Sequence, residues 1–159
     1  MDIRLANNGD IPDLLRLLKQ VGQVHHELRP DIFPEGTLKY DAEALAQLLT
    51  DETRPVFVAV AESAVVGYCF CVRKQFGGSC ATSREELYID DLCVEETCRG
   101  GGIATALYRH AVAYARSLGC HSVTLNVWCG NDAAMSFYEK QGMKPRNMMM
   151  EMRLGEPEC

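Results

Sequence analysis

The feature that most constrains the fold is a run of three glycines between a strand-like segment and an amphipathic helix. The strand pattern LYIDDLCV ends at Val94, and the residues RGGG at 99–102 then lead directly into a segment with apolar residues on one helical face. Gly119 is expected to end that helix, and the strand pattern SVTLNVW follows it. A strand, a helix and a strand joined in this way form a parallel crossover. The chain is therefore expected to contain one parallel pair of strands.

The segments before this crossover predict further strands and helices. IRLA at 3–6 is a short strand pattern, and the hydrophobic stripe that begins at Ile11 predicts a helix with Asp10 as its cap. A second helix is expected from about Tyr40 to Leu49. The runs PVFVAVA and VVGYCFCV predict a β-hairpin that turns at Glu62-Ser63, followed by a loop that contains Gly77-Gly78.

The C-terminal segments complete an α/β (α+β) fold. A short helix is expected from Asp132 to Gln141, and MKPRNMMMEMRL at 143–154 predicts a final strand. Met148, Met150 and Met152 alternate along that strand and are expected in the core. Residues 1–159 are therefore predicted to form one domain. Its sheet is expected to be mixed, mostly antiparallel and twisted, flanked by helices, with one parallel strand-helix-strand crossover.

Composition and charge exclude several classes of protein. Hydrophobic residues make up 47% of the 159 residues, yet no apolar run approaches the roughly 20 residues that span a bilayer. The net charge of -6 lacks the basic patch of a nucleic-acid binder. Eight cysteines occur without a CxxC pair or zinc-ligand spacing, so no metal site is expected and the thiols are expected to be reduced. The N-terminus shows no secretory pattern, so we expect a cytoplasmic location.

The glycine-rich turn is also a candidate anion site. Unpaired N–H groups at a helix start carry the positive end of the helix dipole, and Arg99 can add a charge-assisted contact. Two nucleotide-binding motifs do not fit, because the P-loop Lys and the third glycine of GxGxxG are both missing. Arg99-x-x-Gly102-x-Ala104 instead resembles the R/Q-x-x-G-x-G/A signature of the GCN5-related N-acetyltransferase (GNAT) superfamily. The segment from Asn131 to Met143 is similar to that family's N-x-x-A-x-x-F-Y-x-x-x-G-F pattern, with Met143 in place of Phe.

The resemblance implies acetyl-CoA as the cofactor and transfer of its acetyl group to an amine. In the family, backbone at the positions of Leu92, Cys93 and Val94 pairs with the pantetheine arm. Asn131 is expected to contact the cofactor from the start of the following helix. The pyrophosphate is expected to lie on the backbone amides of Arg99, Gly100, Gly101, Gly102, Ile103, Ala104 and Thr105.

Acetyl transfer needs a base for the amine, donors for the carbonyl oxygen and an acid for the leaving thiolate. The resemblance makes Tyr138 the expected acid, and the alternative is that its hydroxyl only positions the sulfur. Backbone N–H groups near Cys93 are candidate donors to the carbonyl oxygen. Asp90 matches the acidic position of polyamine acetyltransferases and is the expected base, whereas Asp91 is expected to be structural. The alternatives are that Asp90 only pairs with a nearby cation, and that Glu86 or a water acts as the base.

The acceptor is expected to enter opposite the cofactor, over the loop between the first two helices. In or near that loop, His25 could relay a proton, and the alternative is a solvent-facing position at the helix end. Glu27 and Asp31 could bind an ammonium group, and the alternative is that both are simply solvated. Trp128 could form a wall of the acceptor site or pack in the core.

Together these features predict an N-acetyltransferase that moves an acetyl group from acetyl-CoA to a primary amine by direct attack in a ternary complex. The expected acceptor is a small amine, such as a polyamine-like molecule, or a protein amine, with no nucleic acid or membrane as partner. A homodimer that pairs through the last strands is a further expectation. The alternative is a non-catalytic acyl-CoA-binding sensor or regulatory module, which binds the cofactor without turnover.

Overall fold

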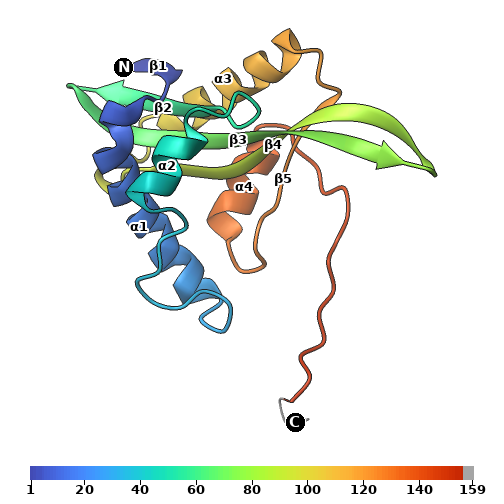
Figure 1. Ribbon diagram of the computed structural model, residues 1–159. Helices are drawn as coiled ribbons and strands as arrows, with labels where there is room; N and C mark the ends of the chain where they lie inside the picture. The colour runs from blue at the N-terminus through green and yellow to red at the C-terminus, as the bar shows by residue number, and fades with distance from the viewer. Residues whose placement is uncertain (156–159) are drawn as a thin grey trace.

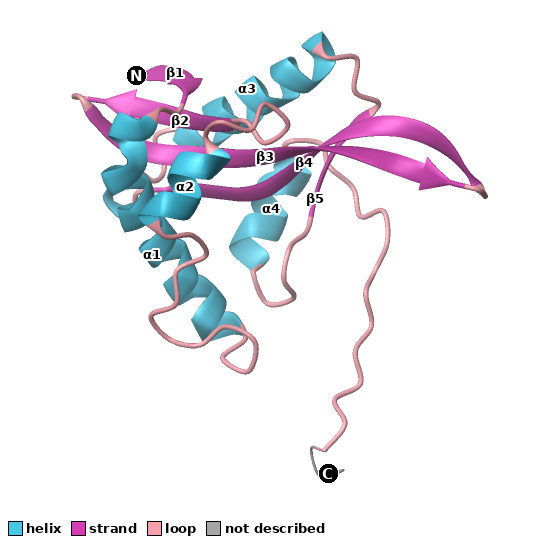
Figure 2. Ribbon diagram, in the orientation of Figure 1, coloured by secondary structure: helices cyan, strands magenta, loops and turns pink. Residues whose placement is uncertain are grey.

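The computed structural model describes residues 1–155, which form one five-stranded sheet with helices on both faces (Figure 2). The strand order follows the chain, and the first four strands pair antiparallel. The fifth strand pairs parallel to the fourth. The predicted mixed sheet with one parallel crossover is therefore confirmed. The strands are β1 (Asp2–Leu5), β2 (Val56–Ala61), β3 (Ala64–Gly78), β4 (Ala81–Val94) and β5 (Ser122–Leu125).

Four α-helices cover the two faces of the sheet (Figure 1). On one face, α1 (Ile11–Leu28) and α2 (Ala42–Leu48) bury leucines against β2 and β3. On the other face, α3 (Ile103–Ser117) and α4 (Asp132–Lys140) pack on a second core of β2, β3 and β4 residues. Amphipathic helices need such a face because only one stripe of each is apolar. No helix within residues 1–155 is long and apolar enough to cross a membrane.

The β3–β4 hairpin is longer than the sequence pattern predicts. The expected loop around Gly77-Gly78 is mostly strand, since pairing continues from Gly67 opposite Val94 to Gly78 opposite Ala81. The outer part of the hairpin is polar: Arg73 forms an ion pair with Glu85, and the Lys74 ammonium lies 3.5 Å from the centre of the Tyr88 ring. Hydrophobic alternation does not reveal such a segment, because cross-strand polar pairs stabilise it instead.

Asp10 does not cap α1 as expected. Its carboxylate accepts hydrogen bonds from the two terminal guanidinium nitrogens of Arg4, at 2.7 and 2.8 Å, and from the backbone N–H of Asn7 at 2.8 Å. A short 3-10 turn, Asn8–Asp10, precedes the helix and turns the carboxylate back toward β1. The side chain therefore joins β1 to the start of α1 rather than satisfying the first turn of the helix.

The predicted final strand over 143–154 is wrong. The residues after α4 have no strand partner within the described chain, and Figure 1 shows them running away from the sheet. Met148, Met150 and Met152 are 80–85% exposed rather than in the core. Alternation predicts an extended conformation, but a strand also needs an edge to pair with. We call residues 144–154 the C-terminal arm. Cys159 lies outside the described residues, and the other seven cysteines are free thiols.

Candidate active site

The glycine-rich turn forms a pocket at the start of α3. Gly100 and Gly102 have φ values of 83° and 80°, a left-handed conformation that a residue with a Cβ adopts only with strain. No side chain within residues 1–155 caps α3, so its first N–H groups are left for another partner. The pocket has a volume of about 270 Å³ and is lined by Val94, Cys98, Arg99, Gly100, Gly102, Ile103, Ala104, Thr105 and Phe137.

Most of the residues expected around the pyrophosphate therefore lie around one pocket. Gly101 does not line it, and neither Leu92 nor Cys93 does. Two lining residues, Cys98 and Phe137, were not predicted. Phe137 packs partly against the α3-side core and also forms the pocket wall.

The edge of β4 opens just before this pocket. β5 pairs only with Glu86 to Ile89, so no strand within residues 1–155 lies on that edge of β4 from Asp90 to Val94. This open edge contains Leu92, Cys93 and Val94. Asn131 stands at the start of α4, where its side-chain oxygen accepts a hydrogen bond from the N–H of Ala134 and so caps the helix. An extended ligand that enters between the two strands can thus meet unpaired backbone groups.

Tyr138 projects from α4 into an aromatic cluster beside the pocket. Its ring centre lies 5.0 Å from that of Phe137 and 6.2 Å from that of Tyr108. The side chain is half-buried, and burial raises its pKa above the ordinary value of 10.0. Within residues 1–155 no protein group hydrogen-bonds to its hydroxyl. The phenol therefore keeps its proton at neutral pH and is available to a ligand.

A β-bulge brings two carboxylates to the same face of β4. Phe70 pairs with Asp91, whereas the next residue, Cys71, pairs with Ile89, so Asp90 is an extra residue in the strand. Strict alternation would direct Asp91 to the face opposite Asp90. The bulge resets the alternation, so both side chains point to the α1–α2 face. Asp90 accepts a hydrogen bond from Lys39 Nζ at 2.7 Å, and Asp91 accepts one from the Tyr68 hydroxyl at 2.9 Å.

The two carboxylates differ in their surroundings. Burial raises the pKa of Asp91, although the nearby Lys39 charge and the Tyr68 hydrogen bond oppose this rise. Burial disfavours the charged form of Lys39, but the hydrogen bond to Asp90 and the negative charges of Asp90 and Asp91 together outweigh it and raise the lysine pKa. With one ammonium and two carboxylates, the group has an excess of negative charge when all are ionised. It can attract a cationic amine.

Glu86 is not placed to act as a free base. It is buried, and Arg146 from the C-terminal arm donates to both of its carboxylate oxygens at 2.8 and 3.1 Å. Arg84 lies 3.4 Å from the same carboxylate. The carboxylate is thus held in an ion-paired network.

The residues expected to bind the acceptor lie at or near the end of α1, but they differ in how free they are to contact an amine. The ring centre of Phe33 lies 5.1 Å from that of His25 and 5.3 Å from that of Trp128, which comes from the segment after β5. Asp31 is not free to bind an ammonium, since Arg29 donates to both its oxygens and lowers its pKa to about 2. Glu27, in the last turn of α1, is exposed and accepts a hydrogen bond from Gln23 at 3.0 Å.

Comparisons with known proteins agree with this geometry. A family model described as the acetyltransferase (GNAT) family matches residues 22–143. N-alpha-acetyltransferase 30 of Schizosaccharomyces pombe is 31% identical over 86 residues, 54% of this chain and 55% of that protein, so the match spans about half the length of that relative. A variant of the BH1408 protein of Bacillus halodurans superposes with a TM-score of 0.91 at 30% identity, covering 97% of this chain and all of that one. An aminoglycoside N-acetyltransferase in complex with CoA shares the fold, with a TM-score of 0.72 at 16% identity over 96% of this chain and 98% of that one.

Proposed function

The chain belongs to the acetyltransferase (GNAT) family, and from this premise we propose that it transfers an acetyl group from acetyl-CoA to a primary amine by direct attack in a ternary complex. The observation that carries the proposal is the open edge of β4 between the Gly100–Gly102 pocket and the Asp90–Asp91 pair. One side of this opening offers amide groups for a phosphate, and the other offers carboxylates for an amine. Tyr138 lies on the pocket side.

The residues present fit acetyl-CoA. A Cβ added to Gly100 or Gly102 would meet no atom within 4 Å, which leaves room for a pyrophosphate close to the backbone. We assign this group to the amides of residues 99–105, and the pantetheine arm to the free backbone of Leu92, Cys93 and Val94. We place Asn131 beside the cofactor at the start of α4. When bound, acetyl-CoA supplies the acetyl group and leaves as a thiolate.

We assign the base to Asp90. A primary ammonium with a pKa near 10.4 must lose a proton before its nitrogen can attack. Asp90 reaches the α1–α2 face beside Lys39, and its side chain is 22% exposed, so an acceptor or a bridging water can approach it. Asp91 is the competing carboxylate, since its raised pKa brings it nearer the working pH of a general base. The Tyr68 hydrogen bond and deeper burial make Asp91 the less accessible of the two.

We assign the acid to Tyr138. Because burial raises its pKa, the phenol is protonated when a thiolate forms nearby and can donate to the sulfur. Backbone N–H groups near Cys93 are assigned to the carbonyl oxygen of the acetyl group. The thiol of Cys93 itself is unsuited to nucleophilic attack, because burial raises its pKa to about 12.

We propose that the acceptor is a small cationic amine or a protein amine. His25 and Trp128 are assigned to the wall of its site, and the exposed Glu27 to the entrance of that site. Asp31 is assigned the role of holding Arg29 in place beside Trp128. The net charge of -6 favours such acceptors over nucleic acid or an anionic membrane. The free cysteines favour a reducing compartment, and we place the activity in the cytoplasm, with a homodimer as the working form.

The proposal is tested by incubating the protein with acetyl-CoA and a panel of polyamines, amino acids, aminoglycosides and peptides. Product mass is the suitable readout, because the eight thiols of the chain interfere with thiol reagents. We expect an acetylated amine whose rate of formation falls about 10-fold in Tyr138→Phe. Tyr108→Phe is the matched control, since Tyr108 lies in the same aromatic cluster and is assigned no proton transfer.

Two further variants test the base. Asp90→Asn should lower kcat by about 100-fold, whereas Asp91→Asn should lower it by less and mainly affect stability. The reverse order would make Asp91 the base. Acetyl-CoA binding without product from any amine would contradict the proposal and support a sensor.

A further inference from the structure

Lys39 brings a primary ammonium group to the carboxylate that we assign as the base. Its Nζ donates a hydrogen bond to Oδ2 of Asp90 at 2.7 Å. Burial disfavours the charged form, but the hydrogen bond and the charges of Asp90 and Asp91 raise the lysine pKa above its ordinary value of 10.5. The group is therefore an ammonium at neutral pH, which is also the chemistry of the proposed acceptor. Lys39 stands where the acceptor nitrogen must come within hydrogen-bond distance of the base.

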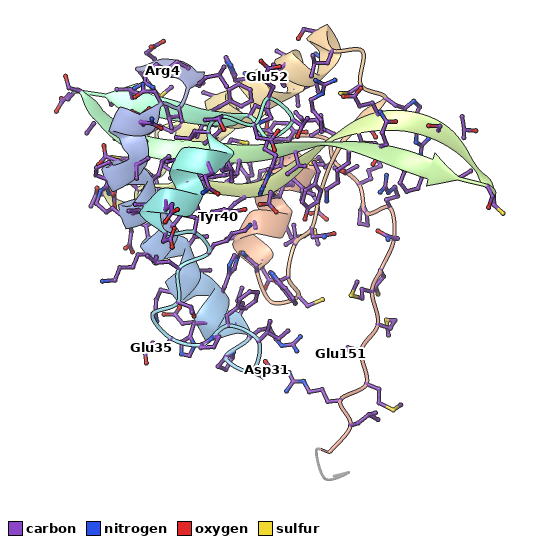
Figure 3. The ribbon with its side chains drawn as sticks, in the orientation of Figure 1. Arg4, Asp31, Glu35, Tyr40, Glu52 and Glu151 are labelled. Carbon is purple, nitrogen blue, oxygen red and sulfur yellow. The ribbon has the colours of Figure 1, made fainter. Side chains whose placement is uncertain are left out.

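The backbone next to Lys39 is anchored, whereas its side chain has a single polar attachment. The ring of Tyr40 stacks on that of Phe70, with centres 5.8 Å apart, and the Tyr40 hydroxyl accepts a hydrogen bond from Arg54 at 2.8 Å. Figure 3 shows Tyr40 beside α2, close to the sheet. The Lys39 side chain is 41% exposed, and Asp90 is its only hydrogen-bond partner within the described chain. The ammonium can thus leave Asp90 for water while the loop keeps its place.

The second carboxylate of this group offers no alternative position for an ammonium. Asp91 accepts the hydrogen bond of the Tyr68 hydroxyl at 2.9 Å, and Tyr68 has no exposed surface. The side chain of Asp90 is 22% exposed and is the one that an incoming amine can reach. Lys39 occupies one oxygen of Asp90, and its charge repels a second ammonium nearby. The acceptor and Lys39 therefore compete for the same carboxylate.

We propose that Lys39 is a tethered competitor of the acceptor: its ammonium occupies the acceptor position at Asp90 in the free protein and is displaced when the acceptor binds. This inference rests on the proposed function, because it takes Asp90 as the group that receives the acceptor. Lys39 thereby determines specificity, since a ligand must replace both the positive charge and the N–H donor at Asp90. A primary ammonium does so. A quaternary ammonium, which has no N–H, does not.

Two substitutions of Lys39 test the competition in steady-state kinetics with an amine acceptor. Lys39→Met keeps most of the stem and removes the charge, so KM for the amine should fall about 10-fold while kcat changes less than about 2-fold. Lys39→Arg offers a planar fork that can hold both carboxylate oxygens, so KM should rise about 5-fold. Lys74→Met is the matched control, because the Lys74 ammonium lies over the Tyr88 ring rather than on Asp90. Its KM should stay within about 2-fold of the wild-type value.

A second measurement follows Lys39 itself and needs no turnover. The chain has five lysines, so isotope-labelled ammonium groups give few NMR signals, and the Lys39 signal is the one that Lys39→Arg lacks. In the free protein the ion pair should slow the exchange of the Lys39 ammonium protons with water. Titration with n-butylammonium should speed this exchange at least about 3-fold by releasing Lys39. Tetramethylammonium at the same concentration controls for ionic strength and should leave the exchange unchanged, since it cannot donate to Asp90.

A raised KM or a large loss of kcat in Lys39→Met would overturn the proposal, because Lys39 would then support the base instead of competing with the acceptor. Equal KM values for the wild type and Lys39→Arg would also overturn it, since a cation held more tightly must compete more strongly. If no amine is acetylated, the proposed function fails, and the NMR titration still decides whether an ammonium displaces Lys39. A Lys39 signal that responds equally to both cations, or to neither, would overturn the displacement itself.

Discussion

The N-terminal and C-terminal parts of the molecule differ in how completely their own chain buries them. Leu14, Leu17 and Leu45 on α1 and α2 have no exposed surface. In contrast, α4 has no buried residue, and all four residues of β5 are only half-buried. In the first region the apolar side chains of α1 and α2 are fully covered, because both helices pack against one face of the sheet. We call this the closed region, and the second region the open region. The second region presents apolar and aromatic surface to the pocket, to the open edge of β4 and to the arm.

This difference indicates a division of labour along the chain. The fully buried leucines of α1 and α2 contribute to stability and touch no proposed ligand, while the proposed cofactor and acceptor both meet the region that is open. A change in the closed region should therefore act on the free energy of unfolding, and a change in the open region on binding.

The largest effect is expected from Leu17→Ala. The Leu17 side chain is fully buried between α1 and the sheet, so truncation removes apolar burial and leaves a cavity. The free energy of unfolding should fall by about 3 kcal/mol, as measured by urea denaturation. Met150→Ala is the comparison from the open region, and in the monomer it should change the value by less than about 0.5 kcal/mol. Equal losses in the two variants would contradict the division.

A smaller effect is expected from Asp10→Asn. The Arg4 hydrogen bonds lower the pKa of Asp10 below its ordinary value of 3.8, so the folded state favours the ionised carboxylate. This stabilisation is present above the unfolded pKa and is lost as the pH falls through the lowered folded pKa. Asp10→Asn should cost about 2 kcal/mol at pH 7 because the bidentate pair is broken.

Denaturation of both forms at several pH values checks this prediction. The difference between wild type and Asp10→Asn should narrow as the pH falls below about 3.8. A difference that stays constant down to the lowest pH would show that the carboxylate charge is not what stabilises the β1–α1 connection.

An effect on stability smaller than that of Asp10→Asn is expected from Gly102→Ala, which sharpens the comparison within the open region. Gly102 and Gly142 both have positive φ, 80° and 88°, and in both cases an added Cβ meets no atom within 4 Å. Alanine at either position should therefore cost about 1 kcal/mol of backbone strain. Only Gly102→Ala should also weaken acetyl-CoA binding, by about 10-fold in calorimetry, because only Gly102 lines the pocket. Equal affinities of Gly102→Ala and Gly142→Ala for acetyl-CoA would contradict the assignment of the glycine pocket to the cofactor.

Much of the fold could be predicted from the sequence because its signals are local. The turn at Glu62-Ser63, the glycine stop at Gly119 and the leucine stripe of α1 each depend on residues a few positions apart. The glycine-rich turn before α3 and the single Gly119 after it likewise indicate the parallel crossover. In these places the chain pattern and the tertiary structure agree.

The remaining features depend on contacts that alternation cannot show. A strand pattern over 143–154 was evident, but whether an edge is available to it depends on the rest of the fold and on other copies. The bulge at Asp90 shifts pairing by one residue, and the unshifted pattern led to Asp91 being treated as separate from the site. Arg146 is far in sequence from Glu86, so their ion pair had no local signal.

Because of the extra residue Asp90, the alternation of side chains between the two faces of the sheet is shifted by one residue in the second half of β4. Before it, odd-numbered residues such as Leu87 and Ile89 face α3, and after it the even-numbered Leu92 and Val94 do. Deleting Asp90 would remove the extra residue, and Asp91, Leu92, Cys93 and Val94 would keep the sides of the sheet that they have now. Straightening the bulge with Asp90 retained would instead send Cys93 toward α3 and Val94 toward α1, exchanging the linings of the two sides of the sheet. The bulge thus lets the strand hold one more carboxylate on the α1–α2 side without changing what faces α3.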